Sequence, residues 1–186
     1  GIEVQVYQGS YADIAAWLKS GTVELGFLSD SCAQDLDFEP LYTDPLICIA
    51  PLGFTTRRPG HVMAEELRGQ PFVSQRSDTD ADIQNYLKRN DLQMRTACYV
   101  IDDESMVGMV ACGQGVAIMP ELLLTRGDTA PGVQVLALEP PAMRSIGIAC
   151  LDQNSLSPAA REFARRARNF AATLQISSFQ TMKKRV

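Results

Sequence analysis

The stretch Ser105–Pro120 constrains the fold more than any other part of the sequence, because helix, turn and strand signals follow one another within it. Ser105 suits the N-cap of a short apolar helix, and Gly113 suits the left-handed residue that follows a helix. Val116–Met119 is typical of a short buried strand, which Pro120 ends. A helix, a tight glycine turn and a core strand predict an α/β sheet, whose sites lie outside the carboxyl ends of its strands.

The beginning of the chain predicts a β-α-β unit. Apolar and polar residues alternate over Ile2–Val6, which indicates a strand. Tyr11–Ser20 has the spacing of a helix, with Ser10 as a candidate cap, and Val23–Leu28 reads as a second strand. Two strands joined by a helix predict parallel pairing and a right-handed crossover.

The remaining elements are expected to alternate between strands and helices, with prolines as interruptions. Pro45 is expected to interrupt a strand, Pro140 and Pro141 are expected to break another, and Ser157-Pro158 is a helix start. That last helix is expected to end near Leu174, before a frayed tail at Ser177–Val186. The expected ranges are Phe38–Tyr42, Leu46–Ala50, Ala64–Gly69, Phe72–Ser74, Ala81–Asn90, Thr96–Ile101, Glu121–Leu124, Val133–Leu138 and Ser145–Leu151.

The order of these elements predicts two lobes. The middle of the chain has strands and helices enough for a core of its own, so the first and last segments are expected to form the other lobe together. The two connections are expected near Leu41–Leu46 and Leu138–Ile146. Two lobes joined by two strands predict a hinge with a ligand cleft between them.

Composition narrows the function. The net charge of −5 argues against a direct grip on nucleic acid, and no apolar run is long enough for a membrane span. The chain does not begin with Met, so we expect a fragment or a processed product, and Gly1–Ser10 lacks the basic and apolar regions typical of a signal peptide. The five cysteines predict buried free thiols in a reducing compartment. No metal site or cofactor is expected, since His61 is the only histidine; a Cys–His61 nucleophilic pair stays a minor alternative.

Several segments, taken in order, resemble the effector-binding domain of LysR-type transcriptional regulators. The matching segments are Ile2–Val6 with Gln8-Gly9-Ser10, Leu18–Gly21 with Val23–Phe27, Pro40–Leu46, Leu67–Val73, Val110–Pro120 and Leu156–Phe163. The resemblance implies a two-lobed periplasmic-binding-protein-like fold of type 2, in the α/β class. Each lobe would be a mixed sheet flanked by helices, with two crossing strands between the lobes. Lobe I is expected at residues 1–44 plus 140–186, and lobe II at residues 45–139.

The chain departs from that family at its beginning. The family's DNA-binding helix-turn-helix, linker helix, and first strand and helix of the effector domain have no counterpart before Ile2. The resemblance therefore implies that promoter DNA is bound only through an absent N-terminal module. It also implies a cytoplasmic homodimer or homotetramer, although a polar loop and a helix used for dimerisation are missing, and no membrane partner.

Four polar loops are expected to converge on the cleft. Helix N-termini among them suit carboxylates, and their aspartates suit an ammonium group, so a small organic acid or an amino-acid-like ligand is expected. The candidate ligand-binding residues are Ser10, Ser29, Asp30, Ser74, Gln75, Asp102 and Asp103. For Ser10, Ser29, Ser74 and Asp102, the resemblance implies contact with the effector. Alternatively, Ser10 and Asp103 cap helices, and Asp30 is a solvated loop residue.

Three functions compete at this point. The leading hypothesis is a ligand sensor without catalytic residues, in which the ligand favours one closure of the lobes. The alternatives are an enzyme on the same scaffold and an exported solute-binding protein. The polar loops offer no histidine or lysine to partner a nucleophile, and the scattered cysteines disfavour export.

Overall fold

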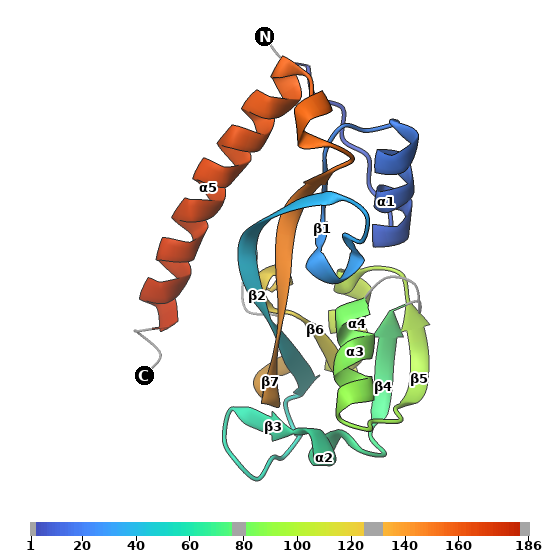
Figure 1. Cartoon of the computed structure of the whole chain (residues 1–186). Coiled ribbons are helices and arrows are strands. Elements are labelled where there is room, and N and C mark those ends of the chain that lie inside the picture. The colour runs from blue at the N-terminus through green and yellow to red at the C-terminus, as the bar shows by residue number, and fades with distance from the viewer. Residues whose placement is uncertain (1–2, 76–80, 125–131, 183–186) are drawn as a thin grey trace. The chain divides into compact units, whose positions relative to one another are not determined.

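The computed structural model of the chain describes residues 3–75, 81–124 and 132–182, with the backbone alone over 174–182 (Figure 1). Helices and strands alternate along most of this length. The helices are α1 (Tyr11–Ser20), α2 (Ala64–Leu67), α3 (Ala81–Arg89), α4 (Asp103–Ala111) and α5 (Pro158–Met182), with short 3₁₀ turns η1 (Asp30–Cys32), η2 (Glu121–Leu123) and η3 (Gln153–Ser155). The strands are β1 (Gly26–Ser29), β2 (Asp37–Pro51), β3 (His61–Met63), β4 (Pro71–Gln75), β5 (Arg95–Val100), β6 (Ala117–Pro120) and β7 (Val133–Cys150).

Contacts within the chain divide it into two compact units. Unit 1 comprises Gly1–Thr43 and Ser145–Val186, and unit 2 comprises Asp44–Arg144. The long strands β2 and β7 each contribute residues to both units, so they are the connections between them. One sheet has the order β1-β7-β2-β6, with β3 also on β7, and β4 pairs with β5 in a second sheet.

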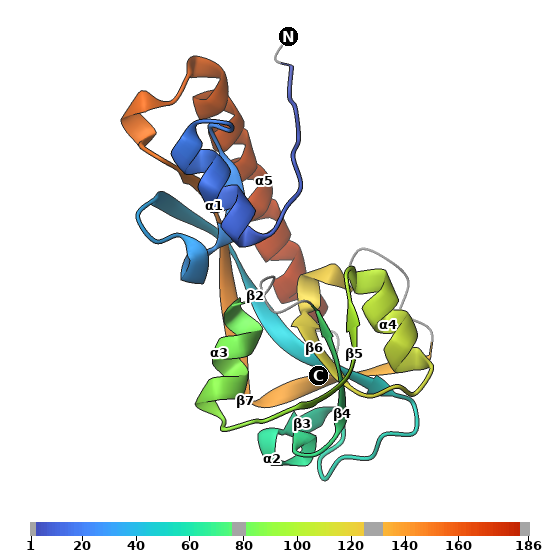
Figure 2. The ribbon, with the colours of Figure 1, turned by 90° about the vertical axis from the view of Figure 1, so that its right-hand side faces the viewer.

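The core of unit 2 explains why β2 carries an unbroken apolar run. Side chains alternate between the two faces of a strand, and here both faces are buried. Cys48 belongs to one apolar cluster, which includes Tyr86 and Leu87 of α3. Ile47 and Ile49 belong to the other, which includes Met106 of α4. Figure 2 accordingly shows α3 and α4 on opposite sides of the strands of this unit.

The helix-turn-strand prediction for Ser105–Pro120 is confirmed, apart from the cap. α4 and β6 lie where expected, and Gly113 has the positive φ of 77° that favours glycine after a helix. The cap is Asp102 rather than Ser105, because the Asp102 carboxylate accepts a hydrogen bond from the Ser105 N–H. Gly115 is required for a second reason: a Cβ there would overlap the backbone of Pro71 at the start of β4.

The structure of unit 1 differs from the predicted β-α-β unit. α1 and its Ser10 cap are confirmed, but residues 3–10 form no strand, and Ile2 lies outside the described residues. β1 pairs with β7 in the antiparallel direction, so the expected parallel pair is wrong. Alternation alone does not make a strand, because a strand also needs a partner for its backbone groups. Val4 and Val6 are accordingly 53% and 88% exposed.

The prolines do not interrupt the long strands. β2 continues through Pro45, and β7 continues through Pro140 and Pro141, with a cis bond between Glu139 and Pro140. Both expected breaks are therefore wrong. Proline removes one N–H donor but keeps a φ compatible with extended backbone, so it is tolerated where that donor is not needed.

The last helix is longer than expected. α5 begins at Pro158, as predicted, and the Ser157 hydroxyl accepts a hydrogen bond from the Ala160 N–H. It continues to Met182, so the expected end near Leu174 and the frayed start of the tail are wrong; the last four residues lie outside the described ones. The sequence after Leu174 contains no glycine or proline that would end a helix.

Candidate functional site

In unit 2 the carboxyl ends of two parallel strands bring candidate residues together. β4 ends with Ser74 and Gln75, and β5 leads directly into Asp102 and Asp103 at the start of α4. The register pairs Gln75 with Val100, so both strands end at the same edge. The Gln75 Nε2 donates a hydrogen bond of 2.6 Å to the Asp103 Oδ1. Of the predicted residues in this unit, Gln75 and Asp103 are therefore joined directly.

The two neighbouring aspartates have opposite electrostatic environments. The Asp102 carboxylate accepts hydrogen bonds from the Ser105 N–H (2.7 Å) and hydroxyl (2.9 Å), and these lower its pKa. Partial burial raises the pKa of Asp103, opposed by the Gln75 hydrogen bond and the positive charge of Arg144. Asp102 therefore serves as a helix cap, whereas Asp103 is the carboxyl group whose charge is costly to maintain.

A buried ion pair that was not predicted from the sequence lies near this edge. Arg144 donates from Nη2 (2.8 Å) and Nε (3.0 Å) to the Asp44 Oδ2, and the other Asp44 oxygen accepts from the Leu122 N–H. Asp44 is fully buried and Arg144 is 9% exposed. A charged residue next to an apolar strand run was the available signal at both positions, since charges there are rarely buried without a partner.

The candidates in unit 1 bind neighbours in sequence. The Ser10 hydroxyl accepts from the Asp13 N–H and donates to the Asp13 carboxylate, which lowers the pKa of Asp13. Ser29, at the end of β1, is fully buried and donates to the Asp30 carboxylate over 3.3 Å. Asp30 is exposed and also accepts from the Ser31 N–H. The capping alternative for Ser10 is thus observed, and Ser29 and Asp30 form one polar corner beside α1.

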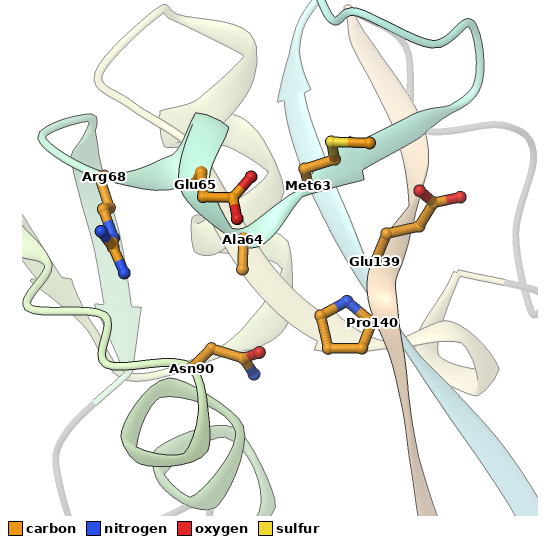
Figure 3. Close-up of a pocket in the computed structure, with 7 residues that line it drawn as sticks. All are labelled: Met63, Ala64, Glu65, Arg68, Asn90, Glu139 and Pro140. Carbon is orange, nitrogen blue, oxygen red and sulfur yellow. The ribbon is translucent and has the colours of Figure 1, made fainter.

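A pocket lies elsewhere in unit 2 (Figure 3). It has a volume of about 250 Å³ and contains none of the residues predicted for ligand binding. Its lining comes from β3, α2, the end of α3 and β7. The lining residues are Met63, Ala64, Glu65, Arg68, Asn90, Glu139 and Pro140.

The cysteines are free, but only some are buried as expected. Cys48 and Cys150 are buried, and burial raises the pKa of Cys48 to about 12. Cys32 and Cys98 are half-buried and Cys112 is exposed, because the end of α4 faces solvent there. Within residues 3–75, 81–124 and 132–182, no three His, Cys, Asp or Glu side chains are grouped as metal ligands would be. No helix in the same ranges is long and apolar enough to cross a membrane.

Comparisons with known proteins agree on one family. The family model described as the LysR substrate binding domain matches residues 1–172. The regulatory domain of Synechocystis PCC6803 CcmR, solved in complex with 2-PG, superposes with a TM-score of 0.78 at 17% identity, covering 87% of this chain and 80% of that one.

Two further solved structures are similar. The effector-binding domain of QuiR, in complex with shikimate, has a TM-score of 0.77 at 24% identity, covering 90% of this chain and 80% of that one. HinK, a LysR family transcriptional regulator from Pseudomonas aeruginosa, has a TM-score of 0.74 at 23% identity, covering 91% of this chain and 61% of that one. No curated protein has a sequence that matches this chain. These likenesses confirm the expected periplasmic-binding-protein-like α/β fold.

Proposed function

Because the chain belongs to the LysR substrate-binding-domain family, we propose that it senses a small effector for a DNA-binding transcriptional regulator. In this proposal residues 1–44 plus 140–186 and residues 45–139 act as two lobes, and the effector binds in the cleft between them. The effector favours one closure of the lobes, and that difference in affinity changes the shape of the regulator.

The observation that best supports the proposal is the Gln75–Asp103 pair. It lies where β4 and β5 end, and ligands of open α/β sheets bind outside the carboxyl ends of strands. Asp103 is partly buried, which destabilises its charged form and raises its pKa. Carboxyl groups with a raised pKa are frequent at functional sites, so Asp103 is a candidate for ligand binding. Ser74 precedes Gln75 in the same strand, and α4 begins at the same edge.

The effector class follows from this chemistry. The Ser74 hydroxyl can donate to a carboxylate, whereas Asp103 suits an ammonium or hydroxyl group. We therefore propose a small organic acid or an amino-acid-like effector. Two relatives were solved with a small molecule, QuiR with shikimate and CcmR with 2-PG, which supports a ligand of this size.

From unit 1, we propose that Ser10, Ser29 and Asp30 complete the site, with Asp102 as the capping residue that positions Asp103. The polar corner of Ser29 and Asp30 lies at the end of β1, as Gln75 lies at the end of β4. These assignments extend the proposal beyond the Gln75–Asp103 pair, and substitutions test each of them separately.

The regulator is proposed to act without catalysis of its own, in the cytoplasm, as a homodimer or homotetramer. Promoter DNA is bound by a helix-turn-helix module outside these residues. The sensing role follows from the family, whose domain is a regulatory one. Nothing in the described geometry favours the enzyme or the exported solute-binding protein over it.

A thermal-shift screen over amino acids and small organic acids tests the proposal, because a ligand that binds only the folded state raises the melting temperature. We expect one chemical class to stabilise the protein, and Gln75→Ala to remove that stabilisation. Gln84→Ala is the matched control, since Gln84 is exposed on α3. If Gln75→Ala responds like the wild type, the assignment of this edge is wrong; if NMR shows the ligand converted to a product, the sensing role is wrong.

A further inference from the structure

The pocket of Figure 3 lies at the opposite end of the small sheet from the proposed effector site. Arg68 lies three residues before Pro71, the first residue of β4, and Asn90 lies before β5, so both are near the amino ends of these parallel strands. Gln75 and Asp103 lie at the carboxyl ends. Figure 1 shows α2 at the tails of the β4 and β5 arrows. A ligand here would therefore occupy a second site within unit 2.

The pocket is held in place by a cap on α2. The Glu66 carboxylate accepts from the Met63 N–H (2.8 Å) and the Arg57 N–H (2.7 Å), and these hydrogen bonds lower its pKa. This fixes the backbone of Met63, Ala64 and Glu65, which form one wall.

Some charged side chains of the pocket already have an ion-pair partner, and others do not. Glu139 forms an ion pair with Arg58, and its Oε1 lies 3.9 Å from the His61 Nε2. Within the part of the chain that the structure describes, the side chains of Arg68 and Glu65 have no hydrogen-bond or ion-pair partner. The pocket thus offers one uncommitted cation and one uncommitted anion.

Asn90 and the apolar residues complete the lining. The Asn90 amide nitrogen donates to the Tyr86 carbonyl over 2.8 Å, which leaves its Oδ1 as an acceptor. Met63, Ala64 and Pro140 contribute apolar surface. Figure 3 shows the Arg68 side chain extending toward the side where Asn90 lies, with the Pro140 ring across the pocket.

We propose that this pocket binds an aliphatic α-amino acid. Arg68 would hold the carboxylate, Glu65 and the Asn90 Oδ1 would accept from the ammonium group, and the side chain would lie against Met63, Ala64 and Pro140. A simple anion would meet the carboxylates of Glu65 and Glu139, and a simple amine would meet Arg68, so a zwitterion matches the charges best. The volume of about 250 Å³ fits a molecule smaller than a typical drug-sized ligand.

Methionine-methyl NMR reports on this site directly, because Met63 lines the pocket whereas Met106 lies buried in α4. We expect L-leucine, added up to about 10 mM, to shift the Met63 methyl resonance in a saturable way. Two probes each remove one charge: 4-methylpentanoate lacks the ammonium group and 3-methylbutylamine lacks the carboxylate. Each is expected to bind about tenfold more weakly than leucine, the effect of losing one charge-assisted hydrogen bond.

Substitutions separate this pocket from the effector site. Arg68→Gln is expected to weaken the Met63 response to leucine about tenfold, while Arg89→Gln, an exposed arginine outside the pocket, leaves it unchanged. Glu65→Gln is expected to reduce the preference for leucine over 4-methylpentanoate. The proposal is overturned if Met63 does not respond, if the carboxylate probe binds as tightly as leucine, or if Gln75→Ala removes the response. In the effector screen, stabilisation by leucine that Gln75→Ala retains would come from this pocket, and stabilisation that Gln75→Ala removes would come from the effector site.

Discussion

The two units hold their polar groups in different ways. In unit 1, two side-chain hydrogen bonds between its two chain segments are exposed: the Ser157 N–H donates to the Glu24 carboxylate, and the Gln153 N–H donates to that of Asp37. Unit 2 joins its first and last residues through the buried pair of Asp44 and Arg144. Exposed contacts exchange easily with water, whereas a buried charge depends on its partner. The arrangement of unit 2 is therefore the one in which a single lost contact costs most.

The candidate residues follow the same division. Ser10 and Ser29 bind groups within three residues of themselves, so their geometry is set by local backbone. Gln75 and Asp103 are far apart in sequence and meet only because β4 and β5 pair. A site assembled from distant segments is more sensitive to the packing of its unit, and substitutions in both units test this comparison.

The largest effect is expected from Asp44→Ala. The substitution leaves the Arg144 guanidinium buried without its counter-charge and the Leu122 N–H without its acceptor. We expect the free energy of unfolding to fall by about 3–5 kcal/mol, measured by urea unfolding at neutral pH.

Glu24→Gln in unit 1 is the matched control. It weakens an exposed contact between distant segments, and we expect a loss of about 0.5 kcal/mol or less. Equal losses for Asp44→Ala and Glu24→Gln would remove the contrast between the units. A double substitution of Asp44 and Arg144 by Leu and Met should recover part of the loss, because it leaves no buried charge.

Intermediate effects are expected from the helix caps, which occur in both units. Asp102→Ala and Ser10→Ala each remove a side chain that accepts from a backbone N–H of the first turn. We expect each to lower the free energy of unfolding by about 1 kcal/mol. The contribution of Asp102 is present while it is ionised and is lost as the pH falls through its lowered pKa.

Calorimetry across pH distinguishes the two caps. The wild-type advantage over Asp102→Ala should shrink in acid, because the capping group titrates there. The Ser10 hydroxyl does not titrate, so the Ser10→Ala difference depends on acid only through Asp13, whose pKa is lowered by its hydrogen bonds with Ser10. A flat pH dependence for the Asp102→Ala difference would contradict the assignment of that cap.

The smallest effect is expected from Asp103→Asn, and it has the opposite sign. Because burial raises the pKa of Asp103 in the folded state, its ionised form costs stability at neutral pH. Asparagine removes this cost, so we expect a higher melting temperature at pH 7. The gain should diminish as the pH falls through the pKa of Asp103, where the wild-type carboxyl is itself neutral.

Glu104→Gln is the control for Asp103→Asn. Glu104 lies on the same first turn of α4 but is exposed, where a negative charge near a helix N-terminus is favourable. We therefore expect no gain from Glu104→Gln. A loss of stability in Asp103→Asn would mean that the Gln75 hydrogen bond outweighs the desolvation of the carboxylate.

The sequence predicted those elements whose signals are local. α1 and α4 have their apolar faces, capping side chains and terminal glycines within one short stretch, so both were found. The same reasoning failed at Pro45 and Pro140, because local rules describe what proline disfavours and not whether a neighbouring strand needs its N–H. It failed at residues 3–10 for the related reason that alternation does not supply a partner strand.

The sequence by itself determined the family and the fold class, since the order of its apolar runs, caps and glycines is enough for both. It also placed Gln75 and Asp103 at the ends of strands. Only the tertiary structure decided that these two side chains bind each other, that Asp44 and Arg144 form a buried pair, and that Arg68, Glu65 and Asn90 surround one pocket. The physical reason is distance along the chain: caps and turns are formed within a few residues, whereas ion pairs and pockets depend on how strands and helices pack.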